Sequence, residues 1–189
     1  MLTNNKFTVS IFPMKDKIKK STKEILDANR QRKSPLQDHF ILFAHDIRSL
    51  HNVGSLFRSA DAFGIHALWL SGFTPVPPRP EISKTALGAE ESVNWAKIDN
   101  ETDSIKTLKS EGYRIYGLEQ TFNSESMTEL TPESKKICLL IGNEVTGIHE
   151  SLIPLIDQFV EIPQFGEKHS LNVSVAAGIA LYAFLDKMV

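Results

Sequence analysis

The sequence predicts an α/β domain with a mostly parallel sheet that helices cover on both faces. Short apolar runs, which are typical of buried strands, alternate with longer helix-forming segments. Strands separated by helices of this length favour parallel pairing, with helices on both sides of the sheet. A chain of 189 residues suits one domain with its own core. The strands are expected at residues 40–44, 67–70, 113–118, 137–141 and 159–162.

The helices are predicted from apolar spacing and from the residues that begin and end them. Gly112 ends one of them, and the proline-rich run 74–80 must be a loop because proline lacks an amide donor. Small residues near the C-terminus allow the last helix to pack closely on the sheet. The helices are expected at residues 53–63, 81–87, 102–111, 148–156 and 171–187.

Composition excludes several classes of protein. A hydrophobic fraction of 41% and a charged fraction of 23% are ordinary for a globular protein and disfavour disordered and fibrous classes. The single cysteine, Cys138, excludes a disulfide within the chain and is expected to be a buried strand thiol. No apolar stretch reaches the roughly 18 residues that span a bilayer, and no signal peptide is evident. We expect a cytoplasmic protein without a membrane partner.

The N-terminal part of the chain is basic. Residues 1–33 hold nine Lys and Arg against three Asp and Glu, whereas the remainder holds twelve against twenty. Helix formers and a thin apolar stripe predict a helix over residues 15–33. We therefore expect a short basic helical extension over residues 1–36, followed by one domain over residues 37–189. Such an arm suits a polyanionic partner, although a solvated helix has the same composition.

The first segment that carries chemistry follows the first predicted strand and spans residues 51–64. Asn52 is expected to cap the helix. The apolar residues of this helix fall on one face and leave Arg58 on the other. Gly54 costs the helix about 1 kcal/mol relative to alanine, so we expect close approach of a ligand or of backbone there. The alternative is a surface arginine on an ordinary amphipathic helix.

Two further segments follow strands nearer the C-terminus. Residues 139–147 run from a strand into a loop bounded by Gly142 and Gly147, and ligands bind at such strand ends in open α/β sheets. Neither a P-loop nor a dinucleotide fingerprint is present, which disfavours NTPases and dehydrogenases. In residues 162–178 either Ser170 or Asn172 is expected to cap the last helix, where polar groups can hold a ligand. The alternatives are a plain turn and a core helix.

Together, the three segments resemble the motifs of the SpoU/TrmH family of RNA 2′-O-ribose methyltransferases, within the SPOUT superfamily. The resemblance runs from about residue 40 to the C-terminus. The matching motifs are Asn52-x-Gly54-x-x-x-Arg58, Ile141-Gly142-Asn143-Glu144-x-x-Gly147, and Ile162-Pro163 through Ser170-Leu171-Asn172-Val173-Ser174. Gln164-Phe165 departs from the methionine often found after Ile-Pro. We do not expect the separate N-terminal RNA-binding domain that some relatives carry.

The resemblance implies a C-terminal trefoil knot, a homodimer, and S-adenosylmethionine as methyl donor. It implies that donor binding falls to Leu118, Gly142, Ile162 and Leu171. Catalytic roles fall to Arg58, which faces the donor site of the partner subunit, and to Glu144, Ser170 and Asn172. RNA contacts are expected from Asn52, Gly54 and Asn143 and, on the basic arm, from Lys17 and Lys20.

The expected reaction is methylation of a ribose 2′-oxygen, with a guanosine of tRNA as substrate. A guanidinium rarely gives up its proton, so we expect Arg58 to pair with an RNA phosphate and stabilise the developing alkoxide. Proton acceptance by a transiently neutral arginine is the other reading. The alternatives for the protein are the same reaction on 23S rRNA and a non-catalytic RNA-binding module. The six histidines have no ligand pair at a recognisable spacing, so no metal is expected.

Overall fold

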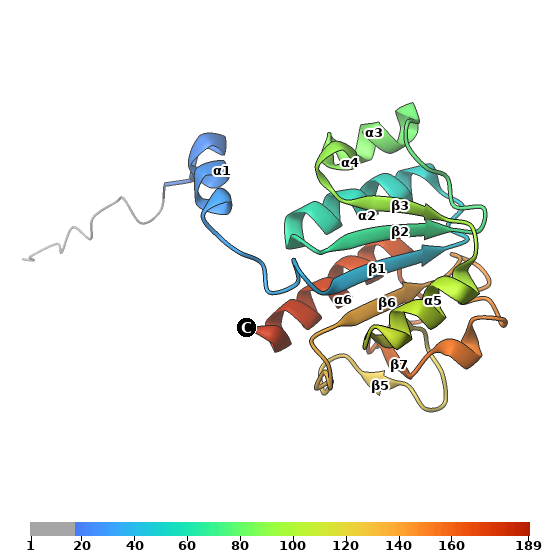
Figure 1. Ribbon diagram of the computed structural model, residues 1–189. Helices are drawn as coiled ribbons and strands as arrows, with labels where there is room; N and C mark the ends of the chain where they lie inside the picture. The colour runs from blue at the N-terminus through green and yellow to red at the C-terminus, as the bar shows by residue number, and fades with distance from the viewer. Residues whose placement is uncertain (1–17) are drawn as a thin grey trace, which may run out of the picture. The chain divides into compact units, whose positions relative to one another are not determined.

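The computed structural model describes residues 18–189 (Figure 1). The chain divides into two units, of which the first ends at Lys33 and the second covers residues 34–189. In the first unit, helix α1 (Thr22–Arg30) begins at Ser21, whose hydroxyl and backbone exchange hydrogen bonds with Glu24. This helix is shorter than the one predicted over residues 15–33. Lys17, predicted to contact RNA, lies outside the described residues, and Lys20 is exposed.

The second unit begins at Ser34 rather than at the predicted residue 37. The Ser34 hydroxyl donates a hydrogen bond of 2.6 Å to the carbonyl of Phe63. Leu36 is fully buried in the core. These contacts tie residues 34–36 to the domain and explain the earlier boundary.

The second unit is built on one parallel sheet, which confirms the predicted fold class. Within the described residues the sheet has seven strands, in the order β3-β2-β1-β6-β4-β7-β5, and every pairing is parallel. The strands are β1 (Phe40–His45), β2 (Ala67–Ser71), β3 (Trp95–Ile98), β4 (Arg114–Leu118), β5 (Glu125–Ser126), β6 (Ile137–Ile141) and β7 (Gln158–Glu161).

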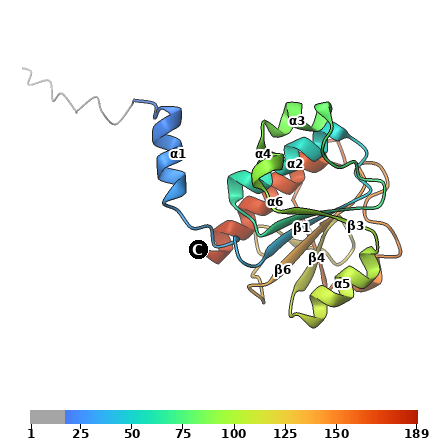
Figure 2. The same cartoon turned by 45° about the horizontal axis from the view of Figure 1, so that its top comes forward.

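Helices cover both faces of this sheet, as Figures 1 and 2 show. On one face α2 packs against α6 and α3, and on the other lie α5 and the short 3-10 helix η2. The bounds are α2 (Leu50–Phe63), α3 (Pro80–Ala86), α4 (Ala89–Ser92), α5 (Glu101–Ser110), η2 (Ile153–Leu155) and α6 (Val173–Met188). Within residues 18–189, no helix is long and apolar enough to cross a bilayer.

The central strands β1 and β6 are buried on both faces. Phe40 and Leu42 face the core beneath α2 and α6, whereas Ile41 and Phe43 face the core beneath α5. Cys138 lies in β6 in the second of these cores, and burial raises the pKa of its thiol. A strand buried on both faces is apolar throughout, which is why these strands stand out as continuous apolar runs.

Four elements of the second unit differ from the sequence prediction, and one of them is the four-residue helix α4, which was not predicted. The helix expected over residues 148–156 is wrong, because this segment forms turns and then η2, where Pro154 has no amide to donate. Strands β3 and β5 were not predicted, since neither is fully buried and β5 has only two residues. All four elements lie at the edges of the sheet or outside it, where hydrophobic periodicity is weakest.

Gly54 is explained by the close packing of α2 on α3. A Cβ atom built on Gly54 would lie 2.0 Å from the Thr85 hydroxyl oxygen and 2.3 Å from the carbonyl oxygen of Ile82. Of the two reasons that the sequence suggested for this glycine, close approach of backbone therefore suffices. A direct contact of Gly54 with RNA stays a prediction.

We expect Gly54→Ala to lower the free energy of unfolding by about 1–3 kcal/mol, because the added methyl group forces α3 away from α2. Urea unfolding measures this change. Gly166→Ala is the matched control, since a Cβ there meets nothing within 4 Å. Equal stability of the Gly54 variant and the unsubstituted protein would contradict this account of the packing.

Candidate functional site

A pocket of about 470 Å³ opens at the carboxyl ends of the neighbouring strands β4, β6 and β7. Its walls are residues 118–120, 141–147 and 161–162, together with the loop before α6 and the first turn of that helix. The residues predicted to bind the donor all line it, although they come from four different segments: Leu118, Gly142, Ile162 and Leu171. The fold therefore brings this predicted set together at one place.

The loop after β6 is held in a tight turn by its two glycines. The backbones of Asn143 and Gly147 exchange hydrogen bonds of 2.9 and 3.0 Å. A Cβ on Gly142 would lie 2.3 Å from the carbonyl oxygen of Gly147, and Gly147 itself has a φ of +70°. Side chains at these two positions would open the turn, so the glycines set the shape of the pocket wall.

Asn143 fixes the same loop with its side chain. Its Oδ1 accepts hydrogen bonds from the amides of Val145 and Thr146 at 2.8 and 3.1 Å. Its Nδ2 donates to the carbonyl of Asp46 at 2.7 Å, which ties the loop to the end of β1. The side-chain amide of Asn143 is thus engaged within the protein on both its oxygen and its nitrogen.

The carboxylate of Glu144 joins the loop after β6 to the start of α2. It accepts hydrogen bonds from the backbone amides of Arg48 and Ser49 at 2.9 and 3.0 Å, and from Asn52 Nδ2 at 2.8 Å. Burial opposes ionisation of this carboxyl group, but these hydrogen bonds outweigh burial and hold the pKa of Glu144 below its ordinary value. Glu144 is therefore an anion whose two oxygens are both held by α2 and the residues just before it.

Asn52 and Asn172 extend this connection to α6. Asn52 Oδ1 accepts a hydrogen bond of 3.0 Å from Asn172 Nδ2. Asn172 caps α6, because its Oδ1 accepts from the amides of Ser174 and Val175. Asn172 was one of the two predicted caps, and the structure confirms it. The side chains of Glu144, Asn52 and Asn172 thus form one chain of hydrogen bonds between three segments.

The prediction that Asn52 caps α2 is wrong. The cap is Ser49, whose hydroxyl oxygen accepts a hydrogen bond of 3.3 Å from the amide of Asn52. Ser49 has an extended backbone and a short hydroxyl side chain, which suits the cap position. The helix therefore begins earlier than predicted, and the Asn52 side chain is left to bridge Glu144 and Asn172.

The remaining predicted residues lie at or beyond the edge of the pocket. Ser170 lines the pocket and is exposed. Arg58 does not line it; it projects into solvent from α2 and lines a second hollow. Arg58 has no hydrogen bond or ion pair with any residue in the described part of the chain. Arg58 is thus not part of the pocket at the strand ends.

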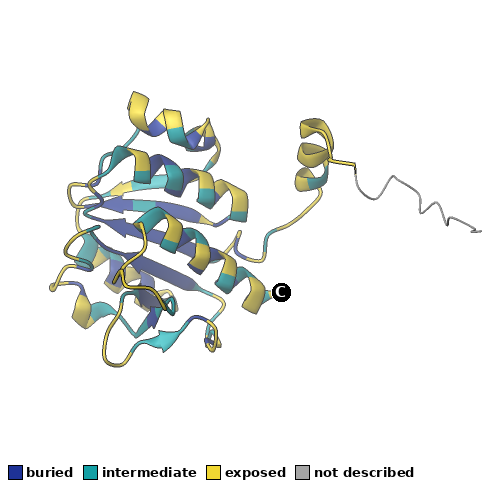
Figure 3. Ribbon diagram, turned by 180° about the vertical axis from the view of Figure 1, so that it is seen from behind, coloured by how far each residue is buried: buried dark blue, intermediate teal, exposed yellow. Residues whose placement is uncertain are grey.

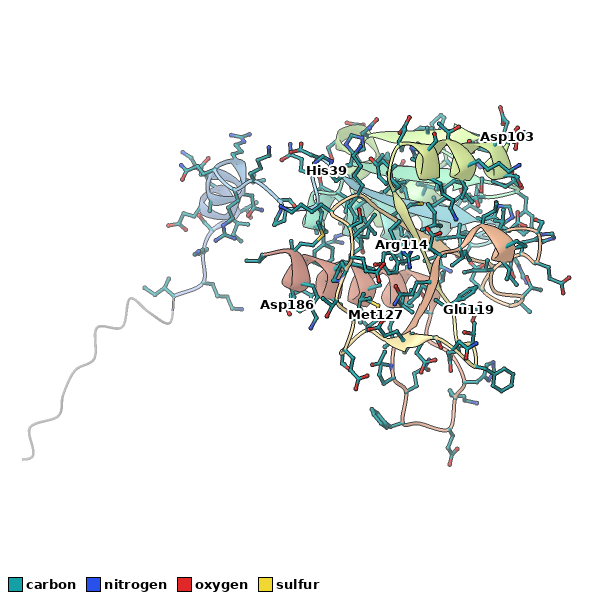
Figure 4. The ribbon with its side chains drawn as sticks, turned by 60° about the horizontal axis from the view of Figure 1, so that its bottom comes forward. His39, Asp103, Arg114, Glu119, Met127 and Asp186 are labelled. Atoms are coloured by element: carbon teal, nitrogen blue, oxygen red, sulfur yellow. The ribbon has the colours of Figure 1, made fainter. Side chains whose placement is uncertain are left out.

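Sequence reasoning missed the acidic and polar residues that follow β4. Glu119, labelled in Figure 4, lines the pocket and accepts a hydrogen bond of 3.3 Å from the amide of Ile148. Gln120 Nε2 donates to the carbonyl of His169 at 2.7 Å, across the mouth of the pocket. Their place directly after a predicted strand was the signal that could have found them.

The pocket carries negative charge. Of the described residues that line it, Glu119, Glu144 and Glu161 are acidic, and none is Lys or Arg. Within residues 18–189 no group of three or more His, Cys, Asp or Glu side chains could hold a metal ion. The pocket therefore suits a ligand with cationic groups better than a polyanion.

A model of the SpoU rRNA Methylase family matches residues 39–182. The chain belongs to this family. Two similar relatives are a 23S rRNA (guanosine-2′-O-)-methyltransferase of Coxiella burnetii, 30% identical over 158 residues, and a tRNA (guanosine(18)-2′-O)-methyltransferase of Aquifex aeolicus, 30% identical over 147 residues. The first match covers 84% of this chain and 61% of the relative, and the second covers 77% and 68%.

Solved structures of the family share the fold. An AdoMet-bound rRNA methyltransferase from Sinorhizobium meliloti superposes with a TM-score of 0.72 at 27% identity, covering 80% of this chain and 57% of that one. The TrmH/SpoU tRNA-modifying enzyme of A. aeolicus gives a TM-score of 0.71 at 26% identity, covering 87% and 83%. This SpoU-family chain thus spans roughly three fifths of the length of several relatives.

We expect Glu144→Gln to lower the free energy of unfolding by about 1–2 kcal/mol, because hydrogen bonds to a carboxylate are stronger than those to a neutral amide. Urea unfolding near neutral pH measures the change. Glu150→Gln is the control, since Glu150 is exposed and its side chain has no hydrogen bond within the described residues. An equally large fall in the free energy of unfolding for the control would contradict the role assigned to Glu144.

The difference in free energy of unfolding between the unsubstituted protein and Glu144→Gln is expected to become smaller in acid. Folding lowers the pKa of Glu144 from its ordinary value of 4.5. The ionised carboxylate therefore stabilises the protein fully at pH values above 4.5. That contribution disappears as the pH falls through the lowered value. Urea unfolding of the unsubstituted protein and of Glu144→Gln over a pH series should show the gap closing, and a gap that widens on acidification would contradict the assignment.

Proposed function

We propose that this chain is an S-adenosylmethionine-dependent methyltransferase that methylates the 2′-oxygen of a ribose in RNA. The observation that carries the proposal is the pocket at the strand ends, where all the residues expected to hold the donor meet. Membership in the SpoU family supports it, and so do relatives whose names describe guanosine 2′-O-methylation in 23S rRNA and in tRNA.

The pocket fits the proposed donor in size and chemistry. Its volume of about 470 Å³ falls within the range of roughly 300–1,000 Å³ typical of small-molecule sites. Leu118, Ile162 and Leu171 offer apolar walls to an adenine ring, beside the backbone of Gly142. The acidic lining suits a cationic sulfonium and an ammonium group. When bound, S-adenosylmethionine supplies an electrophilic methyl group.

Arg58 is proposed to act on the RNA. Its guanidinium is free to pair with a backbone phosphate and to stabilise the charge that develops on the ribose 2′-oxygen. Ser170, exposed at the pocket, is proposed to orient the ribose. Glu144 and Asn172 are better described as positioning residues, because their polar atoms already hold α2, α6 and the loop after β6 together.

We propose that Arg58 completes the pocket of a second copy in a homodimer. Figure 3 shows exposed residues along α6, the helix that ends at the C-terminus. Val175, Ile179 and Tyr182 lie along one side of this helix and are 50%, 40% and 61% exposed, which is unusual for apolar side chains on one helix face. The Tyr182 ring lies 6.5 Å from that of Phe63 on α2, so the stripe adjoins the helix that carries Arg58. A two-fold contact along α6 would bring each Arg58 toward the partner's pocket.

We further propose the trefoil knot that the family resemblance implies, with the segment after β7 threaded through the loop between β4 and β6. Two contacts support it. The amide of Met127 donates to the carbonyl of Glu161 at 2.8 Å, and Gln120 Nε2 contacts the carbonyl of His169. Residues of the loop between β4 and β6 thus lie against the segment that leads into α6.

The proposed substrate is a guanosine of tRNA in the cytoplasm, with 23S rRNA as the alternative. Relatives named for each of the two RNAs are about equally similar to this chain. The basic arm, including Lys17 and Lys20, is proposed to hold the RNA. Mapping of 2′-O-methyl sites in tRNA and rRNA from a deletion strain decides between them, and a complete set of sites in both would refute the activity.

We expect Arg58→Lys to lower the rate of methyl transfer roughly 100-fold while leaving donor binding unchanged, because lysine keeps the charge but loses the two-pronged geometry. Calorimetry with S-adenosylmethionine measures donor binding, and transfer of a labelled methyl group to unmodified RNA measures the rate. Arg114→Lys is the control, because Arg114 begins β4 at the end away from the pocket and pairs with Glu133. Near-normal transfer by the Arg58 variant would contradict its role.

A mixing experiment tests the shared site. Arg58→Ala removes the arginine, and Leu171→Trp is designed to block the pocket of the copy that carries it. If each site uses residues of both copies, a refolded equal mixture of the two inactive proteins regains about a quarter of the unsubstituted activity, through mixed dimers with one complete site. An inactive mixture that still forms mixed dimers would contradict a shared site.

A further inference from the structure

A second hollow, of about 490 Å³, lies between α2 and α3. It is separate from the pocket at the strand ends, with which it shares no lining residue. The residues around it are Ser55, Arg58, Ser59, Ala62 and Phe63 of α2 and Lys84 and Thr85 of α3. Lys84 was not among the residues that the sequence suggested for any role.

This hollow is positively charged. Arg58 and Lys84 are both exposed, and neither has an ion pair or hydrogen bond with any of residues 18–189. The described residues that line the hollow include no carboxylate. Two cations that lie beside one hollow without a counter-ion repel each other, so an anion between them relieves that repulsion and is attracted by both.

The hydroxyl groups of the hollow leave one donor available. Ser55 and Thr85 both donate to the carbonyl of His51, at 2.9 and 3.0 Å, and these protons are engaged. The Ser59 hydroxyl has no hydrogen-bond partner in the described part of the chain. Together with Arg58 and Lys84 it forms a set of donors, which is what phosphate oxygens accept.

We propose that this hollow binds a backbone phosphate of the RNA substrate, held between Arg58 and Lys84, with a hydrogen bond from Ser59. The inference rests on the proposed function and adds Lys84 of α3 as a substrate-binding residue. Arg58 is the link between the two, because the residue proposed to act on the ribose also lines the phosphate site. The acidic pocket and the basic hollow then sort the cationic donor from the anionic RNA.

Gly54 connects this site to the packing of the helices. Its missing side chain lets α3 lie against α2 with Thr85 and Ile82 in contact distance of the glycine. Lys84 is the residue just before Thr85, and Arg58 lies one turn after Gly54 on α2. Close packing at the glycine thus places the two cations on the same hollow, which gives Gly54 an indirect part in RNA binding.

The test measures binding of a short single-stranded oligoribonucleotide of mixed sequence over a range of salt concentrations. This probe needs no knowledge of the methylated site, because phosphate contacts carry no base information. Loss of one phosphate contact reduces the slope of log affinity against log salt by about 0.7. We expect this reduction and several-fold weaker binding for Lys84→Gln, and recovery of most of the slope for Lys84→Arg.

Lys106→Gln is the matched control, because Lys106 is an exposed lysine on α5, which covers the other face of the sheet. An unchanged slope for Lys84→Gln, or an equal reduction for the control, overturns the proposal. Millimolar inorganic phosphate at constant ionic strength separates the two sources of the anion. Phosphate that weakens RNA binding, with the effect lost in Lys84→Gln, supports an RNA phosphate in the hollow. Phosphate binding that depends on Lys84 but leaves RNA affinity unchanged assigns the hollow to free phosphate and overturns the proposal.

Failure of the proposed function has a different signature. Calorimetry with S-adenosylmethionine and the same Lys84 variants is expected to give donor affinity equal to that of the unsubstituted protein, which also shows that the variants are folded. Absence of donor binding in every protein, with the salt slopes as expected, would refute the methyltransferase activity and leave the phosphate site standing.

Discussion

The hydrogen bonds accepted by the Glu144 carboxylate hold the functional region together. They join the loop after β6 to the start of α2, across about a hundred residues of sequence, and Asn52 passes the connection on to Asn172 at the start of α6. Burial alone would raise the pKa of this carboxyl group, and the hydrogen bonds that it accepts lower the pKa instead. An anion held in this way sets the relative positions of three segments, each of which contributes to the pocket or to the hollow beside it.

The sheet supplies the rigid base for these segments. Its central strands, β1 and β6, are buried on both faces, and the pocket opens where β6, β4 and β7, three consecutive strands of the sheet, end. The turn after β6 adds a further wall, whose shape is set by Gly142 and Gly147.

The pocket and the hollow between α2 and α3 carry opposite charges. Glutamates line the pocket, whereas Arg58 and Lys84 line the hollow between α2 and α3. Both sites lie close to α2, since Glu144 of the pocket is bound to the start of this helix. In the proposed reaction a cationic donor meets a polyanion, and each of the two fields attracts one of them. Helix α2 keeps the two charges apart, because its first turn is bound to Glu144 of the pocket and its outer face carries Arg58 of the hollow.

Sequence alone determined the parallel α/β class, both ends of strand β6, and two of the loops that form the pocket, those after β6 and β7. It could do so because buried strands are apolar throughout and glycines mark tight turns. Tertiary structure decided how those loops meet: that Asn52 bridges Glu144 and Asn172 instead of capping α2, and that Lys84 joins Arg58. Only the tertiary structure revealed the edge strands β3 and β5, because their burial depends on neighbouring segments. Local periodicity records how deeply each residue is buried, whereas which distant segments come into contact is set by packing of the whole chain.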